Sequence, residues 1–128
     1  MKTRYMSALS LVVGIAIGAT AVEGLRAQVT PSAYTVTETD ISNMDAYKKE
    51  YVPLVQASIK AAGGHLVAAG ENIVLLDGEP TKTRITINQF DSLEKVQAWR
   101  NSAQFKEARK IGDNYAKFRS VAFEALPQ

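Results

Sequence analysis

The side chains most capable of chemistry belong to one histidine, two tyrosines, and an arginine and an asparagine that lie on the same alternating segment. They are His65, Tyr47, Tyr51, Arg84 and Asn88, and His65 is the only histidine of the chain. An imidazole can exchange a proton near neutral pH, and a guanidinium can hold a carboxylate through two parallel hydrogen bonds. An amide on the same strand face could orient a carbonyl group. We therefore treat His65 and Tyr51 as catalytic candidates, and Arg84, Asn88 and Tyr47 as ligand-binding candidates.

Each candidate also has a purely structural explanation. His65 would begin a strand, where a turn or solvent can satisfy its imidazole. Arg84 could pair with Asp77 or Glu79 in the preceding turn, or with a partner subunit. Two tyrosines one helical turn apart are commonly core residues with a wet edge. Trp99, the only tryptophan, is predicted to anchor a helix to the sheet and is a further ligand-binding candidate.

Composition excludes several other kinds of site. The chain has no cysteine, which excludes disulfides and cysteine-based zinc sites. A metal needs several ligands, and no carboxylate stands at a helical ligand spacing from His65, so we expect neither a metal nor a cofactor. The net charge of +2 and the absence of a dense basic cluster argue against nucleic acid as a partner. The basic residues at positions 95, 100, 106, 109, 110 and 117 are interpreted as solvated helix faces.

The N-terminus has the pattern of a secretory signal peptide. Two basic residues within the first four positions precede the uncharged apolar residues 8–22. This run is shorter than the roughly 20 residues that span a bilayer as a helix. We expect cleavage after Ala27, or alternatively after Ala21, with residues 1–27 as signal peptide and 28–32 as a short lead. The mature protein would be periplasmic or secreted without stable membrane association; an uncleaved anchor is the alternative.

The first half of the domain is predicted to be a strand and a helix. Residues 33–40 alternate and are rich in β-branched and aromatic types, which predicts a strand. Asn43 can cap a helix whose apolar residues recur at three- and four-residue steps. Pro53 would either kink this helix or begin a second short one. Gly63 and Gly64 would end it.

Four further segments are predicted to be strands. Residues 65–69 and 73–77 are short apolar runs around a Gly-Glu-Asn turn, which suggests a hairpin. Residues 84–90 alternate, and residues 119–125 are expected to form the last strand. The division of the hairpin leaves open whether the sheet has four or five strands.

Two capping residues delimit the second helical region. Asp91 is expected to be the N-cap of one helix, with Glu94 in the position of a capping box. Ser102 would cap a following helix rather than act as a nucleophile, because no Gly-x-Ser-x-Gly motif is present. The resulting β-α-β-β-α-β order predicts an α+β, ferredoxin-like antiparallel sheet over residues 33–126, with its helices on one face.

Such a fold leaves the other face of the sheet uncovered. We expect a polar set there, either as solvated surface or as the lining of a wet cleft between two subunits: Thr35, Thr37, Thr39, Arg84, Thr86, Asn88 and Phe90. The alternate positions are expected to pack against the helices: Tyr34, Val36, Ile85 and Ile87.

A set of residues along the whole domain carries a family resemblance. They are Ala33-Tyr34, Tyr47, Tyr51, Gly63-Gly64, Arg84, Phe90, Ala98-Trp99, Ser102 and Phe105. On them, residues 33–125 resemble the family of domains of unknown function numbered 1330, small proteins of the dimeric α+β barrel superfamily. The resemblance implies a homodimer whose two sheets face each other, and it implies no particular activity. Gln89, His65 and Phe105 stand where the family often has Glu, Arg and Tyr, so an acid-base role of that Glu would be lost here.

Three functions remain open at this point. The first is a non-catalytic dimer that binds a small apolar or carboxylated molecule in the cleft between its sheets. The second is a cofactor-free monooxygenase-like or isomerase-like enzyme that uses His65, Arg84 and Tyr51 in one pocket. The third is a module whose open sheet face binds another protein.

Overall fold

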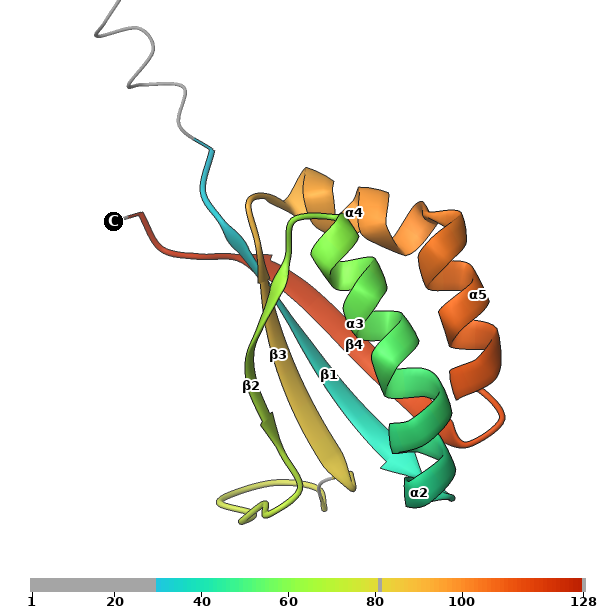
Figure 1. The fold of residues 1–128 in the computed structure, drawn as a ribbon. Helices are drawn as coiled ribbons and strands as arrows, with labels where there is room; N and C mark the ends of the chain where they lie inside the picture. Colours follow the sequence, from blue (N-terminus) through green and yellow to red (C-terminus); the bar gives the residue numbers. More distant parts are fainter. Residues whose placement is uncertain (1–29, 81, 128) are drawn as a thin grey trace, which may run out of the picture. The chain divides into compact units, whose positions relative to one another are not determined.

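The computed structural model describes residues 30–80 and 82–127, so the expected signal peptide lies outside the described residues. The elements are β1 (Ala33–Ile41), α2 (Met44–Ala46), the π-helix η1 (Tyr47–Tyr51), α3 (Val52–Ala61), β2 (His65–Gly70), β3 (Arg84–Phe90), α4 (Leu93–Asn101), α5 (Ala103–Gly112) and β4 (Ala116–Glu124). The strands form one open sheet in the order β2-β3-β1-β4, with every neighbouring pair antiparallel. The helices lie together on one face of it (Figure 1). The predicted ferredoxin-like α+β arrangement is confirmed.

The first helical region changes from a π-helix to an α-helix just before Pro53. The ring of a proline clashes with the carbonyl group four residues earlier and offers no N–H to it. Here the backbone N–H of Val52 reaches back five residues to the carbonyl of Tyr47, and a regular α-helix with Pro53 in its first turn follows. The expected second helix therefore begins at Val52 with Pro53 in its first turn, after one wide turn that carries Tyr47 and Tyr51.

Polar caps delimit the helices much as the sequence indicates. The side chain of Asn43 accepts a hydrogen bond from Ala46 N at 3.1 Å, and that of Ser102 accepts one from Phe105 N at 3.2 Å. The predicted cap at Asp91 is wrong by one residue, because Ser92 accepts from Lys95 N at 3.1 Å. None of the helices in the described residues is long and apolar enough to cross a membrane.

The predicted strand at residues 73–77 is wrong. This segment belongs to the loop between β2 and β3, and it pairs with no strand of the described sheet. Its side chains include Val74 and Leu76, which are 77% and 87% exposed. A short apolar run becomes a strand only where a neighbour offers its backbone groups, and the sheet here has four strands.

The two faces of the sheet are the reverse of those expected. Thr35, Thr39, Asn88 and Phe90 are buried, and the positions of this set on β1 and β3 pair with one another across the strands. They therefore face the helices. The alternate positions lie on the uncovered face. On β1 and β3 they are partly buried, and they are Tyr34, Val36, Ile85 and Ile87. Val121 and Phe123 of β4 lie on the same face and are exposed. The polar set thus lines the interior, and the apolar set is open.

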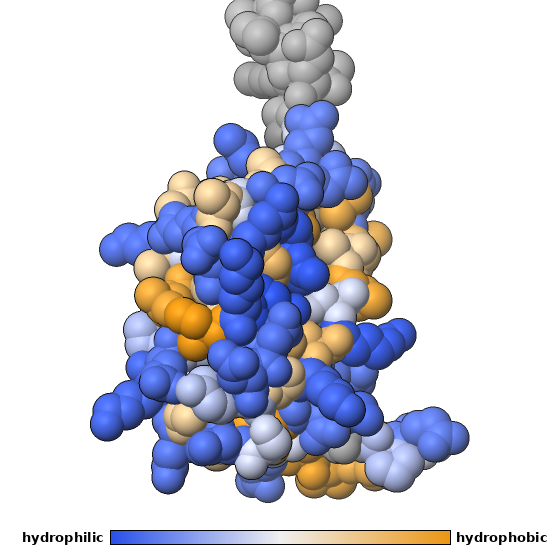
Figure 2. Space-filling model, turned by 90° about the vertical axis from the view of Figure 1, so that its right-hand side faces the viewer, coloured by the Kyte–Doolittle hydropathy of each residue, from blue (hydrophilic) through white to orange (hydrophobic). Residues whose placement is uncertain are grey.

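The side of the molecule that carries α3 and α5 is mainly hydrophilic. Figure 2 shows this side, with apolar residues in separate patches between polar ones. Beneath the helices, the buried residues form two clusters, one around Phe90, Trp99 and Phe105 and the other around Tyr47 and Tyr51. The space between these clusters is where the candidate site lies.

Candidate functional site

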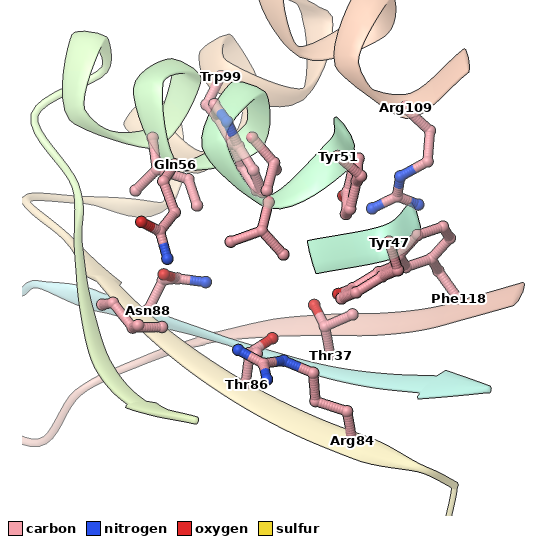
Figure 3. Close-up of a pocket in the computed structure, with 14 residues that line it drawn as sticks. Thr37, Tyr47, Tyr51, Gln56, Arg84, Thr86, Asn88, Trp99, Arg109 and Phe118 are labelled. Atoms are coloured by element: carbon pink, nitrogen blue, oxygen red, sulfur yellow. The ribbon is translucent and has the colours of Figure 1, made fainter. Parts of the chain in front are cut away.

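An internal pocket lies between the helices and the inner face of the sheet. We call it the inner pocket, and its lining is Thr37, Tyr47, Tyr51, Val52, Val55, Gln56, Ile59, Leu66, Arg84, Thr86, Asn88, Trp99, Arg109 and Phe118. Five of the six candidate residues are among these, and Figure 3 shows them around one space. The inner pocket belongs to a single chain and is not the cleft between two sheets that the sequence suggested.

Arg84, which lines the inner pocket, belongs to an ion-pair network. Arg84 Nη1 donates to Glu71 Oε1 at 2.7 Å, and Lys48 Nζ lies 3.2 Å from the same oxygen. Glu71 follows β2 and was not expected to pair with Arg84; the suggested partners were Asp77 and Glu79. Hydrogen bonds from Lys48 and then Arg84 hold the pKa of the Glu71 carboxyl below its ordinary value.

A second arginine also lines the inner pocket. The guanidinium of Arg109, on α5, stacks over the rings of Phe118 at 3.7 Å and Phe105 at 4.9 Å. Among the described residues, no carboxylate oxygen lies within 4.0 Å of it. Figure 3 shows it beside Tyr51 and Tyr47. Burial, and then the charge of Arg109, lower the pKa of Arg100, whose guanidinium lies 4.5 Å from the Phe105 ring.

The interpretation of positions 100 and 109 as solvated helix faces is therefore wrong. Arg109 stands four residues after Phe105 and three before Gly112, on the stripe of α5 that faces the sheet. Side chains at such spacings share one helix face. That spacing could have identified Arg109 from the sequence, whereas nothing in composition distinguishes it from Lys110.

Several polar atoms of the inner pocket have no hydrogen-bond partner within the described part of the chain. They are Asn88 Oδ1, Arg84 Nε and Arg109 Nε. Asn88 is only 5% exposed, and its amide nitrogen makes just a long contact of 3.5 Å to Thr35 Oγ1. Leaving a buried polar atom unpaired costs about 1–3 kcal/mol. Three such atoms belong to residues that line one cavity, and only water or polar groups from outside the described residues would satisfy them.

The two tyrosines bring aromatic surface and neutral hydroxyls. Their rings lie 5.2 Å apart, and both are almost fully buried. Burial raises the pKa of Tyr47 and of Tyr51, although the charge of Arg109 opposes the shift in both. Both phenols therefore stay protonated at neutral pH and can donate a hydrogen bond, but they are poor general bases there.

Trp99 joins three elements at the side of the inner pocket. Its ring packs 5.1 Å from Phe90 and 4.7 Å from Phe105. Its indole N–H donates to Ser58 Oγ at 2.9 Å, which ties α4 to α3. The anchoring role expected of Trp99 is observed, and the same ring contributes to the lining.

His65 lies apart from the other candidates. Its register partner is Gln89, which places it on the open face of the sheet at the start of β2, whereas Arg84 and Tyr51 line the interior. The constellation of His65, Arg84 and Tyr51 in one pocket is therefore wrong. His65 instead borders a surface depression next to the inner pocket, together with Lys60 and Leu66.

Comparisons with known proteins place this architecture among small α+β proteins. The uncharacterised protein RPA0582 from Rhodopseudomonas palustris is similar with a TM-score of 0.65 at 15% identity, over 85% of this chain and 94% of that one. SnoaB, a cofactor-independent oxygenase from Streptomyces nogalater, has a TM-score of 0.57 at 9% identity, over 77% and 97%. HapK from Hahella chejuensis has a TM-score of 0.56 at 11% identity, over 75% and 94%. At these identities the likeness concerns the fold alone.

Sequence comparison gives the family. No curated protein matches the chain. The family model described as domain of unknown function (DUF1330) matches residues 32–126, nearly the whole of the described domain. The matched segment runs from the residue before β1 to just past β4 and includes every element that lines the inner pocket. The chain therefore belongs to the family of domains of unknown function numbered 1330.

Proposed function

We propose that the protein binds a small, planar, largely apolar molecule that carries an acidic oxygen, in the inner pocket of each chain together with the surface depression that adjoins it. The observation that carries this proposal is the guanidinium of Arg109, which borders an aromatic cavity without a carboxylate partner among the described residues. The fourteen lining residues supply two cations, several aromatic rings and no carboxylate. Such a lining favours an anion over a neutral or cationic molecule of the same shape.

The interactions of Arg109 are strong enough to select an acid over its neutral amide. Stacking on Phe118 and Phe105 stabilises the Arg109 cation by about 0.5–2 kcal/mol. A hydrogen bond between charged groups contributes about 1.5–3 kcal/mol. Since about 1.4 kcal/mol corresponds to a factor of ten in affinity, an acid should bind roughly tenfold more tightly than its neutral amide.

Calorimetric titration with benzoate and benzamide tests the proposal, because the two molecules share a flat ring and differ in charge. Benzoate should bind with a dissociation constant at least tenfold lower. Binding should also change the emission of Trp99, the only tryptophan, which lines the inner pocket. Equal affinities for the two molecules, or no binding of either, would refute the proposal.

A pair of neighbouring substitutions provides the control. Arg109→Gln should remove the preference for benzoate and leave the affinity for benzamide within about twofold. Lys110→Gln makes the same change of charge at an adjacent side chain that is 75% exposed and forms only a surface pair with Glu107. If Lys110→Gln lowers benzoate affinity as much as Arg109→Gln, the effect is one of overall charge and not of the inner pocket.

A cofactor-independent oxygenase is the second candidate function. The likeness in fold to SnoaB supports it, together with a cationic pocket that would favour the deprotonated form of an enol or phenol. In such a reaction the electrons for reducing oxygen come from the substrate anion itself. Oxygen uptake with 1,3-dihydroxynaphthalene, measured against a protein-free control, tests this candidate. A rate no higher than the control would leave binding as the supported function.

We also propose that the open face of the sheet is covered by a second copy of this chain. Its support is the apolar character of that face, on which the rings of Tyr34 and Phe123 lie 6.0 Å apart and Val121 is 45% exposed. Contiguous apolar surface of this kind is typical of an interface. Sedimentation should give a dimer that Ile87→Lys dissociates and the exposed α4 change Gln97→Lys does not. A monomer at high concentration would leave the face to a different protein partner.

Export to the periplasm or cell exterior is the remaining proposal, and it rests on the N-terminal pattern alone. Expression of the full chain followed by N-terminal sequencing of the extracytoplasmic fraction would test it. The expected mature protein begins at Gln28, or alternatively at Val22. An intact N-terminus in the cytoplasmic fraction would count against export.

A further inference from the structure

The inner pocket is continued by a larger depression at the surface. We call this depression the outer cavity, and it lies where α3 passes the start of β2. The two spaces share Gln56, Ile59, Leu66 and Asn88 in their linings, so these four side chains form the boundary between them. The outer cavity measures about 410 Å³ and the inner pocket about 40 Å³. The inner pocket thus has room for only a few water molecules. The outer cavity next to it has the volume of a typical small-molecule site, roughly 300–1,000 Å³.

The length of the combined site follows from the elements that line it. On α3 the lining extends from Val52 to Lys60, about 12 Å at the rise of an α-helix. On β3 it extends from Arg84 to Asn88, about 13 Å at the rise of a strand. Figure 3 shows Gln56 and Asn88 on one side of the inner pocket and Tyr47 and Arg109 on the other. A molecule with one ring would fill only part of this length, whereas two linked rings would match it.

The boundary contains an unpartnered polar atom. Asn88 lines both spaces, is 5% exposed, and its Oδ1 accepts no hydrogen bond within the described part of the chain. Gln56 and Leu66, its neighbours at the boundary, are exposed on the outer side. Side chains of this kind can move apart at little cost, which would merge the two spaces and offer Asn88 Oδ1 to a passing ligand.

The outer end of the combined site is positively charged or protonatable. Lys60, in the last turn of α3, and His65, at the start of β2, both line the outer cavity and are exposed. β2 is an edge strand, and its register shifts between Leu66 and Ala68. A bulge at an edge loosens the strand locally, so the gap between α3 and β2 is the place where the wall can open.

We infer that the ligand is an elongated acid about two rings long, which enters between α3 and β2 and places its acidic end near Arg109. This inference rests on the proposed function and names the ligand class and the access route. A second acidic group at the far end would lie near Lys60 and His65. These two residues then select for a diacid without taking part in chemistry.

Three acids and two substitutions test the inference. Biphenyl-4-carboxylate should bind at least tenfold more tightly than benzoate, and biphenyl-4,4′-dicarboxylate a further three- to tenfold more tightly. Lys60→Gln should abolish the gain of the diacid and leave the monoacid within twofold. Ala57→Trp places a large ring in the outer cavity without touching the lining of the inner pocket. It should weaken biphenyl-4-carboxylate at least tenfold and change benzoate by less than threefold.

Ala61→Trp is the matched control, because Ala61 is also exposed on α3 but borders a different depression. If Ala61→Trp weakens biphenyl-4-carboxylate as much as Ala57→Trp, or if biphenyl-4-carboxylate binds no more tightly than benzoate, the inference is overturned while the proposed function stands. If none of the three acids binds, the proposed function itself fails. Thermal denaturation of each variant shows whether it is folded.

Discussion

Gly112, the last residue of α5, allows Tyr51 to lie where it does. A methyl group added at Gly112 would lie 2.7 and 2.8 Å from two carbons of the Tyr51 ring and 3.1 Å from the ring of Phe118. Ordinary carbon contacts are about 3.5–4.0 Å, so Gly112→Ala requires a ring to move by roughly 1 Å. Both rings line the inner pocket, and Tyr51 is only 3% exposed. The substitution should therefore affect both stability and binding.

The expected loss of stability is moderate. Overpacking of a buried site typically costs about 1–3 kcal/mol. Replacing glycine by alanine within a helix returns about 1 kcal/mol, which leaves a net destabilisation of about 0–2 kcal/mol. Urea denaturation followed by the emission of Trp99 measures this difference. In a domain of this size the upper end of that range corresponds to a fall in melting temperature of roughly 8–16 °C.

Two further variants test whether the close contact between Gly112 and the Tyr51 ring causes the loss of stability. Gly70→Ala is the control, because a methyl group there would meet nothing within 4 Å, and it should leave stability unchanged or slightly raised. Tyr51→Leu removes the ring that the new methyl group would strike. The double variant of Gly112→Ala and Tyr51→Leu should therefore be more stable than the sum of the single effects predicts, by at least about 1 kcal/mol. Strict additivity would show that the close approach of Gly112 to Tyr51 is not what limits this position.

Three further substitutions have distinct expected results. Trp99→Phe removes the 2.9 Å hydrogen bond to Ser58 and part of a buried ring, and should cost about 2–4 kcal/mol in urea denaturation; a loss below 1 kcal/mol would contradict its anchoring role. Burial raises the pKa of Tyr47 above its ordinary value of 10.0, so the folded state binds this proton more tightly. The contribution of Tyr47 to stability should therefore be fully present below pH 10 and be lost as the pH rises above it. Tyr47→Phe should reduce that alkaline loss, and an unchanged loss in urea midpoints between pH 9 and 11.5 would refute the assignment. The pKa of Glu71 is lowered from 4.5, so the contribution of its ion pairs to stability is present at neutral pH and lost as the pH falls below that value. Glu71→Gln should therefore reduce the loss of stability at acid pH. It should also free Arg84 from its ion pair and tighten benzoate binding two- to fivefold.

Local patterns in the sequence predict most of the element order. The alternation of residues 84–90 predicts β3 with its observed bounds, and Asn43 and Ser102 cap the helices expected of them. Pro53 predicts the break in the first helical region. Each of these features depends on the stereochemistry of a few adjacent residues, which the chain carries with it wherever it folds.

The candidate residues Arg84, Asn88, Tyr47, Tyr51 and Trp99 also line one pocket, as their types suggested. Their position in the fold was nevertheless misassigned. Alternation tells which side chains share a face of a strand, but it does not tell which face the helices cover. The usual expectation that apolar residues face the helices fails for β1 and β3, because their threonines, Arg84 and Asn88 face the interior while Tyr34, Val36, Ile85 and Ile87 lie on the open face beside polar residues such as Glu38 and Arg119.

Long-range pairing decided the remaining features. The apolar residues 73–77 resemble a strand in sequence, but the described sheet offers them no neighbour. Glu71 meets Arg84 and Lys48 only because the end of β2, the start of β3 and the π-helix lie together at one end of the sheet. Arg109 enters the site from a helix that lies far from β3 along the chain.

By itself, the sequence determined most of the elements and their order, the caps at Asn43 and Ser102, and the residue types available for binding. Only the tertiary structure decided which face of the sheet became interior, that Arg109 lines the inner pocket with no carboxylate partner among the described residues, and where His65 lies. The physical reason is that caps and alternation are set by neighbouring residues. The choice of interior face and the pairing of charges instead depend on contacts between segments that meet only when the whole chain is packed.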